Sequence, residues 1–350
     1  MDATRKPAPE LLVFQPSEAL LAAIDASLGR LAARPRRLAV AFSGGRDSTM
    51  LAVHAAALAQ RDVLELHLLH IHHGLQAIAD LWQRQAHELA ERLGVVCHSL
   101  RVEVTGSDAD GTEAAARVAR YRGLALLAEQ AGVEHILLGH HRDDQAETVL
   151  LRLLRGSGPQ GLAAMGDSMS RDGLTYLRPL LDVDRSVIDE VAERFERQTG
   201  WLCADDPTNA EDRYTRSALR ERIVPELDRR WPSWRPILAR HARLAAQTNA
   251  ILEEVAEEDF GRLEPSEDGS GFSLARWREL SEARQAHVLR YWLEMHELRM
   301  PTERRLREWM RQLRGLHAMG HDRHMRVKHG QAWIVCIKGR VSLETPDSGI

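Results

Sequence analysis

Two adjacent glycines lie between a short apolar run and the start of a helical pattern in LAVAFSGGRDS, residues 38–48. Glycine lets the backbone turn sharply and approach a ligand closely, because it has no Cβ. The helix that follows points its free N–H groups and the positive end of its dipole at the turn, which suits phosphate. Asp47 is well placed to hold Mg²⁺ on such phosphates. The loop alone is equally consistent with an ordinary strand-to-helix turn. The candidate phosphate-binding residues are Ser43, Gly44, Gly45, Arg46, Asp47 and Ser48.

Three carboxylates lie in the first turns of a second predicted helix, within LGHHRDDQAET, residues 138–148. Asp143 and Glu147 are four residues apart and Asp144 and Glu147 three apart, so two acids can face one pocket. Acids at a helix N-terminus can simply complement the dipole, each by about 0.5 kcal/mol. Three acids beside two histidines exceed what that role requires. The ε-ammonium group of lysine suits such paired carboxylates, and an acid must accept a proton before the amine can attack.

Three histidines in four positions, His70, His72 and His73, end a predicted strand. A zinc site is one interpretation, but His70 and His72 alternate to one face of a strand and His73 points to the other. No further ligand follows at a spacing that zinc sites use. We therefore expect His73 and Gly74 to line a nucleotide pocket at the end of this strand.

Strands and helices alternate through the first half of the chain, which predicts an α/β fold with a doubly wound parallel sheet. Ligands bind such sheets at the carboxyl ends of the strands, where these motifs lie. Beyond about residue 236 the alternation stops, and we expect a second, mainly helical domain with short strands at 324–328 and 332–338. The predicted domains are residues 1–228 and 229–350. The predicted strands of the first domain are 38–42, 63–71, 95–104 and 134–138, and its helices include 17–33, 48–60, 79–93, 113–131 and 143–154.

The composition is that of an ordinary globular protein, with 44% hydrophobic and 28% charged residues and a net charge of −4. Arginine concentrates in two stretches: residues 213–244 hold nine arginines against three acids, and residues 301–330 hold seven arginines and one lysine against three acids. Such runs are often solvated helix faces, yet two of them in an acidic chain favour a polyanion-binding surface.

The three cysteines, Cys97, Cys203 and Cys336, form no CxxC pair, which fits a reducing cytosol and argues against an iron–sulfur cluster or a persulfide relay. No apolar run approaches the roughly 20 residues that span a bilayer, and no signal region opens the chain. We therefore expect a cytoplasmic protein that does not bind membranes.

The SGGRDS loop resembles the SGGxDS signature of the pyrophosphate-loop ATPases, which cleave ATP between its α- and β-phosphates and adenylate a substrate. Within them, HHRDDQAET at residues 140–148, HGL at 73–75, EAAAR at 113–117 and RPLL at 178–181 are similar to the pattern of the tRNA(Ile)-lysidine synthetases. The nearest alternative is a tRNA thiolase of the same superfamily, which transfers sulfur to a tRNA base and needs catalytic cysteines that this chain does not pair.

This resemblance implies an adenine nucleotide alpha hydrolase-like fold, ATP and Mg²⁺ as cofactors, and a ligase that forms a C–N bond. Its substrates would be tRNA(Ile) with a CAU anticodon and free L-lysine, and its oligomeric state a homodimer. The implied catalytic residues are Asp47 (also the Mg²⁺ ligand), Asp143, Asp144, Glu147 and Arg178. The implied nucleotide-binding residues are Ser43, Gly44, Gly45, Arg46, Asp47, Ser48, His73, Gly74, Gly139 and His140. The implied tRNA-binding residues are Arg117, Arg155, Arg216 and Arg220.

Overall fold

The structure is a computed structural model that describes residues 14–74, 78–103, 112–204, 215–316 and 324–344. The chain divides into two compact units, Met1–Ala246 and Gln247–Ile350. Within the described ranges, no helix is long and apolar enough to cross a membrane.

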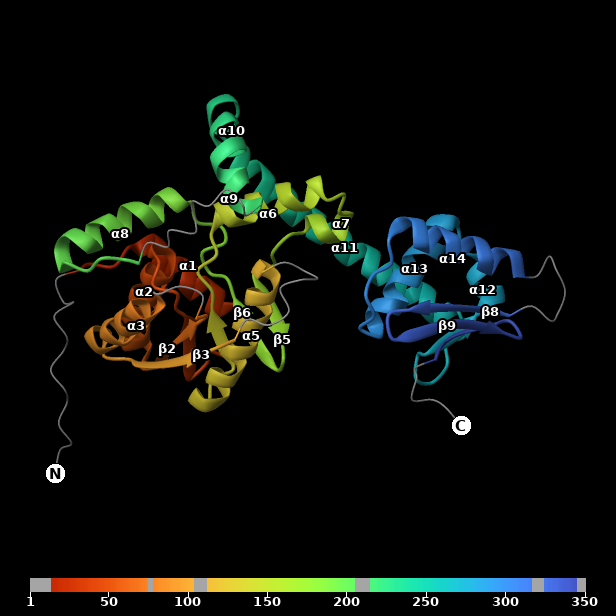
Figure 1. The fold of residues 1–350 in the computed structure, drawn as a ribbon, viewed down its shortest axis with the longest axis horizontal. Coiled ribbons are helices and arrows are strands. Elements are labelled where there is room, and N and C mark those ends of the chain that lie inside the picture. The colour runs from red at the N-terminus through yellow and green to blue at the C-terminus, as the bar shows by residue number, and fades with distance from the viewer. Residues whose placement is uncertain (1–13, 75–77, 104–111, 205–214, 317–323, 345–350) are drawn as a thin grey trace. The chain divides into compact units, whose positions relative to one another are not determined.

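A six-stranded sheet forms the centre of the first unit, with strand order β3-β2-β1-β4-β6-β5 (Figure 1). Five strands are parallel, which confirms the predicted sheet, and β5 pairs antiparallel with β6 at one edge. The edge hairpin was not predicted, because β5 is short, polar and mostly exposed. The strands are β1 (Arg37–Ala41), β2 (Glu65–His72), β3 (Val96–Arg101), β4 (His135–Leu137), β5 (Ser168–Arg171) and β6 (Leu174–Leu177).

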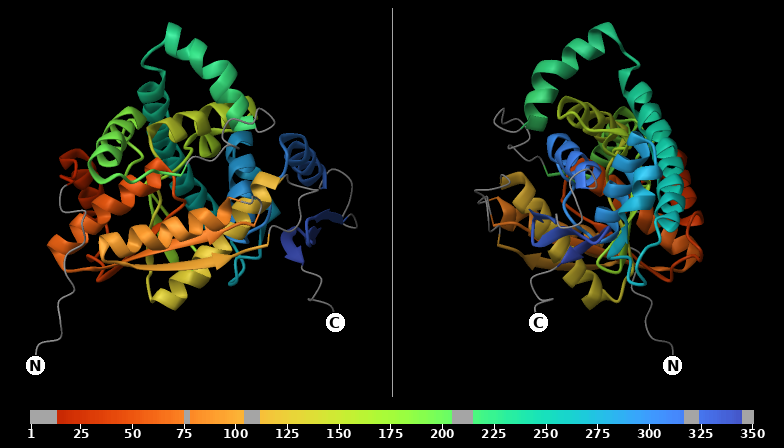
Figure 2. Two further views of the ribbon diagram at one scale, coloured as in Figure 1. Left: turned by 60° about the vertical axis from the view of Figure 1, so that its left-hand side comes forward. Right: turned by 90° about the vertical axis from the view of Figure 1, so that its right-hand side faces the viewer.

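Helices cover both faces of this sheet, as alternation along β1 requires. Leu38 and Val40 belong to the core on one face, while Ala39 between them belongs to the core on the other. Figure 2 shows the helices on either side of the strands. The first face packs against α1 (Glu18–Gly29), α2 (Arg46–Asp62), α3 (Ala79–Leu93) and α8 (Arg185–Thr199), and the second against α5 (Thr112–Ala131).

Two helices begin where neighbouring parallel strands end. β1 leads into α2 and β4 leads into α6 (Arg142–Leu154), so the N-termini of α2 and α6 meet at the carboxyl edge of the sheet. The short helix α7 (Pro159–Leu162) follows α6.

A run of helical segments follows residue 215: α9 (Thr215–Ala218), the π-helical turn η3 (Leu219–Ile223), α10 (Val224–Arg230) and α11 (Trp234–Arg262). Pro225 has no N–H to donate to Glu221, which interrupts the α-helical ladder where the π-helical turn lies. Such turns are rare and often occur at functional sites.

The second unit combines helices with a four-stranded antiparallel sheet in the order β7-β10-β9-β8. The predicted strands near 324–328 and 332–338 are confirmed as β8 (Met325–His329) and β9 (Ala332–Ile337). Sequence reasoning missed β7 (Gly271–Ser273), which has only three residues, and β10 (Arg340–Glu344). The helices α12 (Leu274–Glu279), α13 (Glu282–Met295) and α14 (Glu303–Gly315) share a core with this sheet.

The two units meet within α11, later than the boundary at 228–229 that the sequence predicts. The first turns of α11 belong to the first unit because their side chains bind it. Trp234 is buried, Arg235 pairs with Asp143, and Arg243 Nη1 lies 2.8 Å from Asp182 Oδ1.

Candidate active site

The glycine loop between β1 and α2 is closed by its own side chains. The Ser48 hydroxyl donates to the Gly45 carbonyl at 3.1 Å and accepts the Ser43 N–H at 3.2 Å. Gly44 has a φ of +94°, which favours glycine, and a Cβ there would lie 3.1 Å from the Ala204 Cβ. The loop therefore leads directly into the N-terminus of α2, where the free backbone N–H groups lie. This arrangement suits phosphate.

Gly139, where β4 ends, lets this loop approach α6. A Cβ on Gly139 would lie 3.3 Å from the Asp47 carbonyl carbon and 3.3 Å from the Ser48 nitrogen, so a side chain would push the two segments apart. Asp47 Oδ1 is buried and has no hydrogen-bond partner among the described residues. Burial raises the pKa of Asp47, and the nearby carboxylate of Asp144 adds to this, although His141 opposes it. A buried carboxylate oxygen that accepts no hydrogen bond from the described residues, beside a phosphate-type loop, fits a cation ligand.

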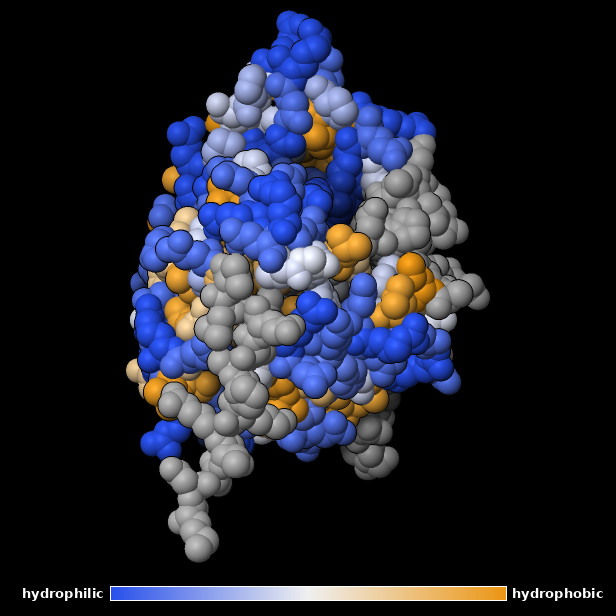
Figure 3. All heavy atoms as spheres, turned by 90° about the vertical axis from the view of Figure 1, so that its left-hand side faces the viewer, coloured by the Kyte–Doolittle hydropathy of each residue, from blue (hydrophilic) through white to orange (hydrophobic). Residues whose placement is uncertain are grey.

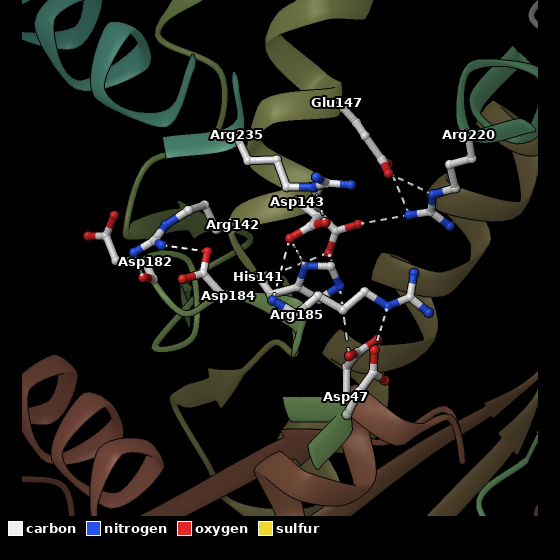
Figure 4. Close-up of polar contacts among 12 residues, drawn as sticks. Asp47, His141, Arg142, Asp143, Glu147, Asp182, Asp184, Arg185, Arg220 and Arg235 are labelled. Carbon is white, nitrogen blue, oxygen red and sulfur yellow. Dashed lines mark hydrogen bonds and ion pairs between the residues drawn. The ribbon is translucent and has the colours of Figure 1, made fainter. Parts of the chain in front are cut away.

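His141 lies between this loop and the carboxylates of α6 (Figure 4). Its ring is buried, with Nε2 3.7 Å from Asp47 Oδ1 and 3.5 Å from Asp144 Oδ2, and Nδ1 4.0 Å from Asp143 Oδ1. The Asp144 carboxylate also accepts the His141 backbone N–H at 3.2 Å, which caps α6. One imidazole thus contacts the phosphate-type loop and two of the three predicted carboxylates.

Glu147, the third carboxylate, forms a bidentate ion pair with Arg220 of η3. Arg220 Nε lies 2.7 Å from Oε1 and Nη2 lies 2.9 Å from Oε2, while Nη2 also lies 3.3 Å from Asp144 Oδ1. Arg216 contributes a second guanidinium, 3.5 Å from Glu147 Oε2 and 3.0 Å from the Thr148 hydroxyl. Burial raises the pKa of Asp144, but His141, His140 and Arg216 outweigh it and leave that pKa below its usual value.

Asp143 is bound from the opposite side by Arg235 of α11 (Figure 4). The same guanidinium pairs with Asp228 and lies over the Trp234 ring, 4.6 Å from its centroid. The Arg185 N–H at the start of α8 approaches Asp143 Oδ1 at 3.4 Å. All three carboxylates are therefore held by basic groups from later parts of the chain.

The histidines at the end of β2 form separate contacts and no shared metal site. His70 donates to the Phe42 carbonyl through Nδ1 at 3.0 Å. His72 accepts the Gly74 N–H through Nδ1, so its Nε2 donates to Asp80 at 2.9 Å. Among the described residues, no group of three or more His, Cys, Asp or Glu side chains could hold a metal ion. His73 is half-buried beside them, and burial lowers its pKa.

A second cluster near His140 consists of arginines without carboxylate partners among the described side chains. Burial lowers the pKa of Arg120, and the positive charge of Arg117 lowers it further. Arg178 is buried, donates to the Gly166 carbonyl at 2.7 Å, and has a pKa lowered by burial. Burial lowers the pKa of His140 to about 3, so its ring is neutral at ordinary pH. Buried guanidinium groups that repel one another are suited to an anion.

Comparison with known proteins gives two family matches. Residues 18–227 match the PP-loop domain, and residues 272–342 match the TilS substrate binding domain. The tRNA(Ile)-lysidine synthase of Bordetella bronchiseptica is 54% identical over 97% of this chain and 98% of its own length. That of Polaromonas naphthalenivorans is 38% identical over 84% of this chain and 85% of its own length. The chain belongs to the tRNA(Ile)-lysidine synthase family.

A solved structure of a tRNA thiolase supports the fold of this lysidine synthase family member and nothing finer. The U34-tRNA thiolase NcsA from Methanococcus maripaludis, with its [4Fe-4S] cluster, aligns with a TM-score of 0.53 at 18% identity. The alignment covers 65% of this chain and 79% of the thiolase. Burial raises the pKa of both Cys97 and Cys203 to about 12, which keeps these thiols protonated and poorly nucleophilic. The thiolase alternative therefore has no support from the chain's chemistry.

The structure gathers most predicted residues of the synthase site at one edge of the sheet, with two exceptions. Arg46 points away from the loop toward acids of α8, 3.6 Å from Asp189 Oδ1 and 3.4 Å from Glu196 Oε2. Arg155 is exposed at the C-terminal end of α6. Arg216 and Arg220, which the resemblance implies as tRNA contacts, both lie against Glu147. Sequence reasoning assigned no role to Arg120, His141, Arg185 and Arg235 at the site.

Proposed function

We propose that this protein is a tRNA(Ile)-lysidine synthase that adenylates the wobble cytidine of tRNA(Ile) with a CAU anticodon and then joins lysine to it. In the first step the C2 oxygen of the cytidine attacks the α-phosphate of ATP, and pyrophosphate leaves. In the second step the ε-amine of free L-lysine attacks C2, AMP leaves, and the amine gives up its proton. Family membership supports this reaction, and the contiguous loop and carboxylate cluster support its two-step course.

The loop Ser43–Ser48 would bind the phosphates of ATP. Gly44 lets the loop take its sharp turn, because its φ is +94° and a Cβ there would meet Ala204. Asp47, whose Oδ1 accepts no hydrogen bond from the described residues, would hold Mg²⁺, which would neutralise charge on the departing pyrophosphate. His73, Gly74, Gly139 and His140 would complete the nucleotide pocket. Arg178 would add a guanidinium for the phosphoryl oxygens.

The carboxylates of α6 would receive lysine. Asp143, Asp144 and Glu147 are each paired with a guanidinium, so this site already binds cations through hydrogen-bonded ion pairs. The ε-ammonium of lysine is a cation of the same charge and would exchange for part of these contacts. The carboxylates would also take the proton that the amine must lose before it attacks.

Arginines without a carboxylate partner among the described residues would contact the tRNA. Arg117 lies with its guanidinium over the Tyr121 ring, and it stands near the buried arginines at His140. Arg155 is exposed at the end of α6. These positions would bind backbone phosphates around the flipped cytidine, since RNA loops expose bases that can enter a pocket. Arg216 and Arg220, which bind Glu147, would link these phosphate contacts to the carboxylates.

We also propose a cytoplasmic homodimer. The described cysteines are all free thiols, as the reducing compartment where tRNA and ATP meet would keep them. The dimer rests on the family resemblance, and sedimentation of the purified protein measures it directly.

One observation carries this proposal: His141 contacts both Asp47 of the glycine loop and Asp144 of the carboxylate helix. A nucleotide on the loop and an amine on the carboxylates would therefore lie next to each other, as adenylation followed by amine attack requires.

The test is lysine transfer to RNA. The purified protein is incubated with tRNA(Ile) transcript, Mg-ATP and radiolabelled lysine, and label retained on the tRNA is counted. We expect transfer by the wild type and a loss of more than 100-fold in Asp47→Ala. The matched control, Asp25→Ala, removes an exposed carboxylate paired with Arg34 and Arg61 and should retain transfer. Pyrophosphate release without lysine transfer by the wild type would contradict the proposed second step.

A further inference from the structure

A helical hairpin projects from the first unit beside α6, the helix that carries the three carboxylates (Figures 1 and 2). It consists of η3, α10 and the first turns of α11, and is called here the projecting hairpin, residues 219–240. α10 buries none of its side chains, and Ile223 before it is 43% exposed. A helix that buries no face is not held by a hydrophobic core, so other contacts must hold this hairpin in place.

Those contacts lie at its base. Arg220 on the outgoing arm binds Glu147, and Arg235 on the returning arm binds Asp143, so both arms are attached to α6. Trp234 packs the two arms together: its side chain is 5% exposed, and its Nε1–H donates to Asp228 Oδ1 at 2.7 Å. The base of the hairpin is therefore fixed on the catalytic carboxylates.

Trp231, three residues earlier, has the opposite environment. It is 54% exposed, and it is the one tryptophan among the large exposed hydrophobic residues of the described chain. Its backbone is fixed, because its N–H donates to the Leu227 carbonyl at 2.7 Å and its own carbonyl accepts the Trp234 N–H at 2.8 Å. The Arg230 guanidinium lies over the indole, 5.6 Å from the ring centroid. The hairpin thus presents to solvent an indole on a fixed backbone, with a guanidinium over its ring.

The surroundings of this indole favour a polyanion. Residues 215–243 hold eight arginines against three acids. Arg230 and Arg240 make no ion pair within the parts of the chain that the structure describes. On the face drawn in Figure 3, the projecting tip is coloured mostly hydrophilic. Exposed aromatic rings among arginines are how proteins stack the unpaired bases of single-stranded RNA.

We propose that Trp231 stacks an unpaired base of the tRNA anticodon loop next to the cytidine that enters the active site. This inference rests on the proposed function, because it assumes that the carboxylates at the base of the hairpin face that cytidine. Trp231 lies four residues before Arg235, whose side chain binds Asp143, so the indole is close enough along the chain to meet a base that neighbours the reacting cytidine. Trp231 would thus help to select an open anticodon loop over paired RNA.

The first measurement is affinity for an anticodon stem–loop RNA of tRNA(Ile). We expect Trp231→Ala to weaken binding about 5- to 50-fold and Trp231→Phe to stay within about 3-fold of the wild type, because phenylalanine keeps a stacking face. The control Leu126→Ala trims an exposed apolar residue of α5 and should change nothing. The salt dependence of binding should be unchanged in Trp231→Ala, whereas Arg240→Gln should reduce its slope by about one ion.

A fluorescent base gives the direct signal. With 2-aminopurine placed beside the wobble position, binding to the wild type should quench its emission by stacking, and Trp231→Ala should abolish the quenching at saturating protein. If Trp231→Ala lost equal affinity for a fully paired duplex, the inference would be overturned. A change in the sedimentation of free Trp231→Ala would also overturn it, because Trp231 would then be a contact between subunits. If the wild type transfers lysine and Trp231→Ala binds the stem–loop normally, this inference fails alone. If the wild type transfers no lysine, the proposed function fails with it.

Discussion

The carboxylate of Glu147 and the guanidinium of Arg220 form two parallel contacts, at 2.7 and 2.9 Å, across 73 residues of sequence. Glu147 is buried, so this pair neutralises a charge that would otherwise be expensive in the interior. Arg220 lies on a π-helical turn. The extra residue in such a turn changes the direction of its side chain from the one that a regular α-helix would give. The pair joins the proposed lysine site to the projecting hairpin.

Removing one partner of this pair should lower the free energy of unfolding more than removing both partners. Arg220→Ala leaves Glu147 buried with Arg216 as its remaining close cation, and we expect a loss of about 3 kcal/mol in the free energy of unfolding. Adding Glu147→Gln should recover at least 1 kcal/mol of that loss, because the uncompensated charge is removed. Urea unfolding of the wild type, both single variants and the double variant measures the coupling. Strict additivity of the two single effects would show that the residues do not interact.

Glu147→Gln alone should separate the two half-reactions. The amide keeps the shape of the side chain but removes the negative charge that a lysine ammonium needs. We expect the KM for lysine to rise at least 10-fold, while pyrophosphate release from ATP and tRNA stays within about 3-fold. Glu193→Gln, an exposed acid on α8, serves as the control. An equal loss in both half-reactions would place Glu147 outside the lysine site.

The fold follows from local signals. Apolar strands, glycine turns and amphipathic helices alternate clearly from residue 38 to 154, and α3 matches its predicted range of 79–93. The edge hairpin of β5 and β6 and strands β7 and β10 gave weak signals, because they are short and their pairing depends on the sheet they join. The position where the two units meet depends on how the start of α11 packs against the first unit. The hydrophobic periodicity of the sequence does not predict that packing.

The site was predictable only where its residues are close in sequence. The loop Ser43–Ser48 and the acids of α6 are compact motifs, and parallel strand ends bring them together. Arg235 reaches Asp143 from far along the chain, and its spacing carries no signal of that pairing. Arg46 illustrates the opposite limit: it lies within the loop motif, yet the acids Asp189 and Glu196 of α8 draw its side chain away.

Gly44 provides a matched test of the phosphate loop. Gly44→Ala forces alanine into a φ of +94° and brings its Cβ to 3.1 Å from Ala204. We expect a loss of about 1–2 kcal/mol in stability and a fall of at least 100-fold in pyrophosphate release. Gly156→Ala carries a similar backbone strain at φ +74°, but nothing lies within 4 Å of its Cβ. It should lose comparable stability and keep its activity; equal activity losses would mean that strain, and not the loop's fit to phosphate, is responsible.

His54 should make the protein sensitive to acid. Its buried ring donates from Nδ1 to the Met50 carbonyl at 2.7 Å and accepts the Ser17 N–H at 2.9 Å, which joins α1 to α2. Burial lowers the pKa of His54 to about 4. Because the unfolded histidine binds protons at about pH 6.5, the unfolded chain takes up more protons between these values, and stability falls as the pH drops.

This one residue should account for about 3 kcal/mol between pH 6.5 and 4, since each pKa unit corresponds to 1.36 kcal/mol. His70, whose pKa burial also lowers to about 4, adds to the same trend. Urea unfolding across this range should show a shallower pH dependence for His54→Gln than for the wild type, although the variant is less stable at pH 7.5. His241→Gln, which replaces an exposed histidine of α11, should follow the wild-type curve. If His54→Gln and the wild type lose stability in parallel, the acid sensitivity arises from other groups.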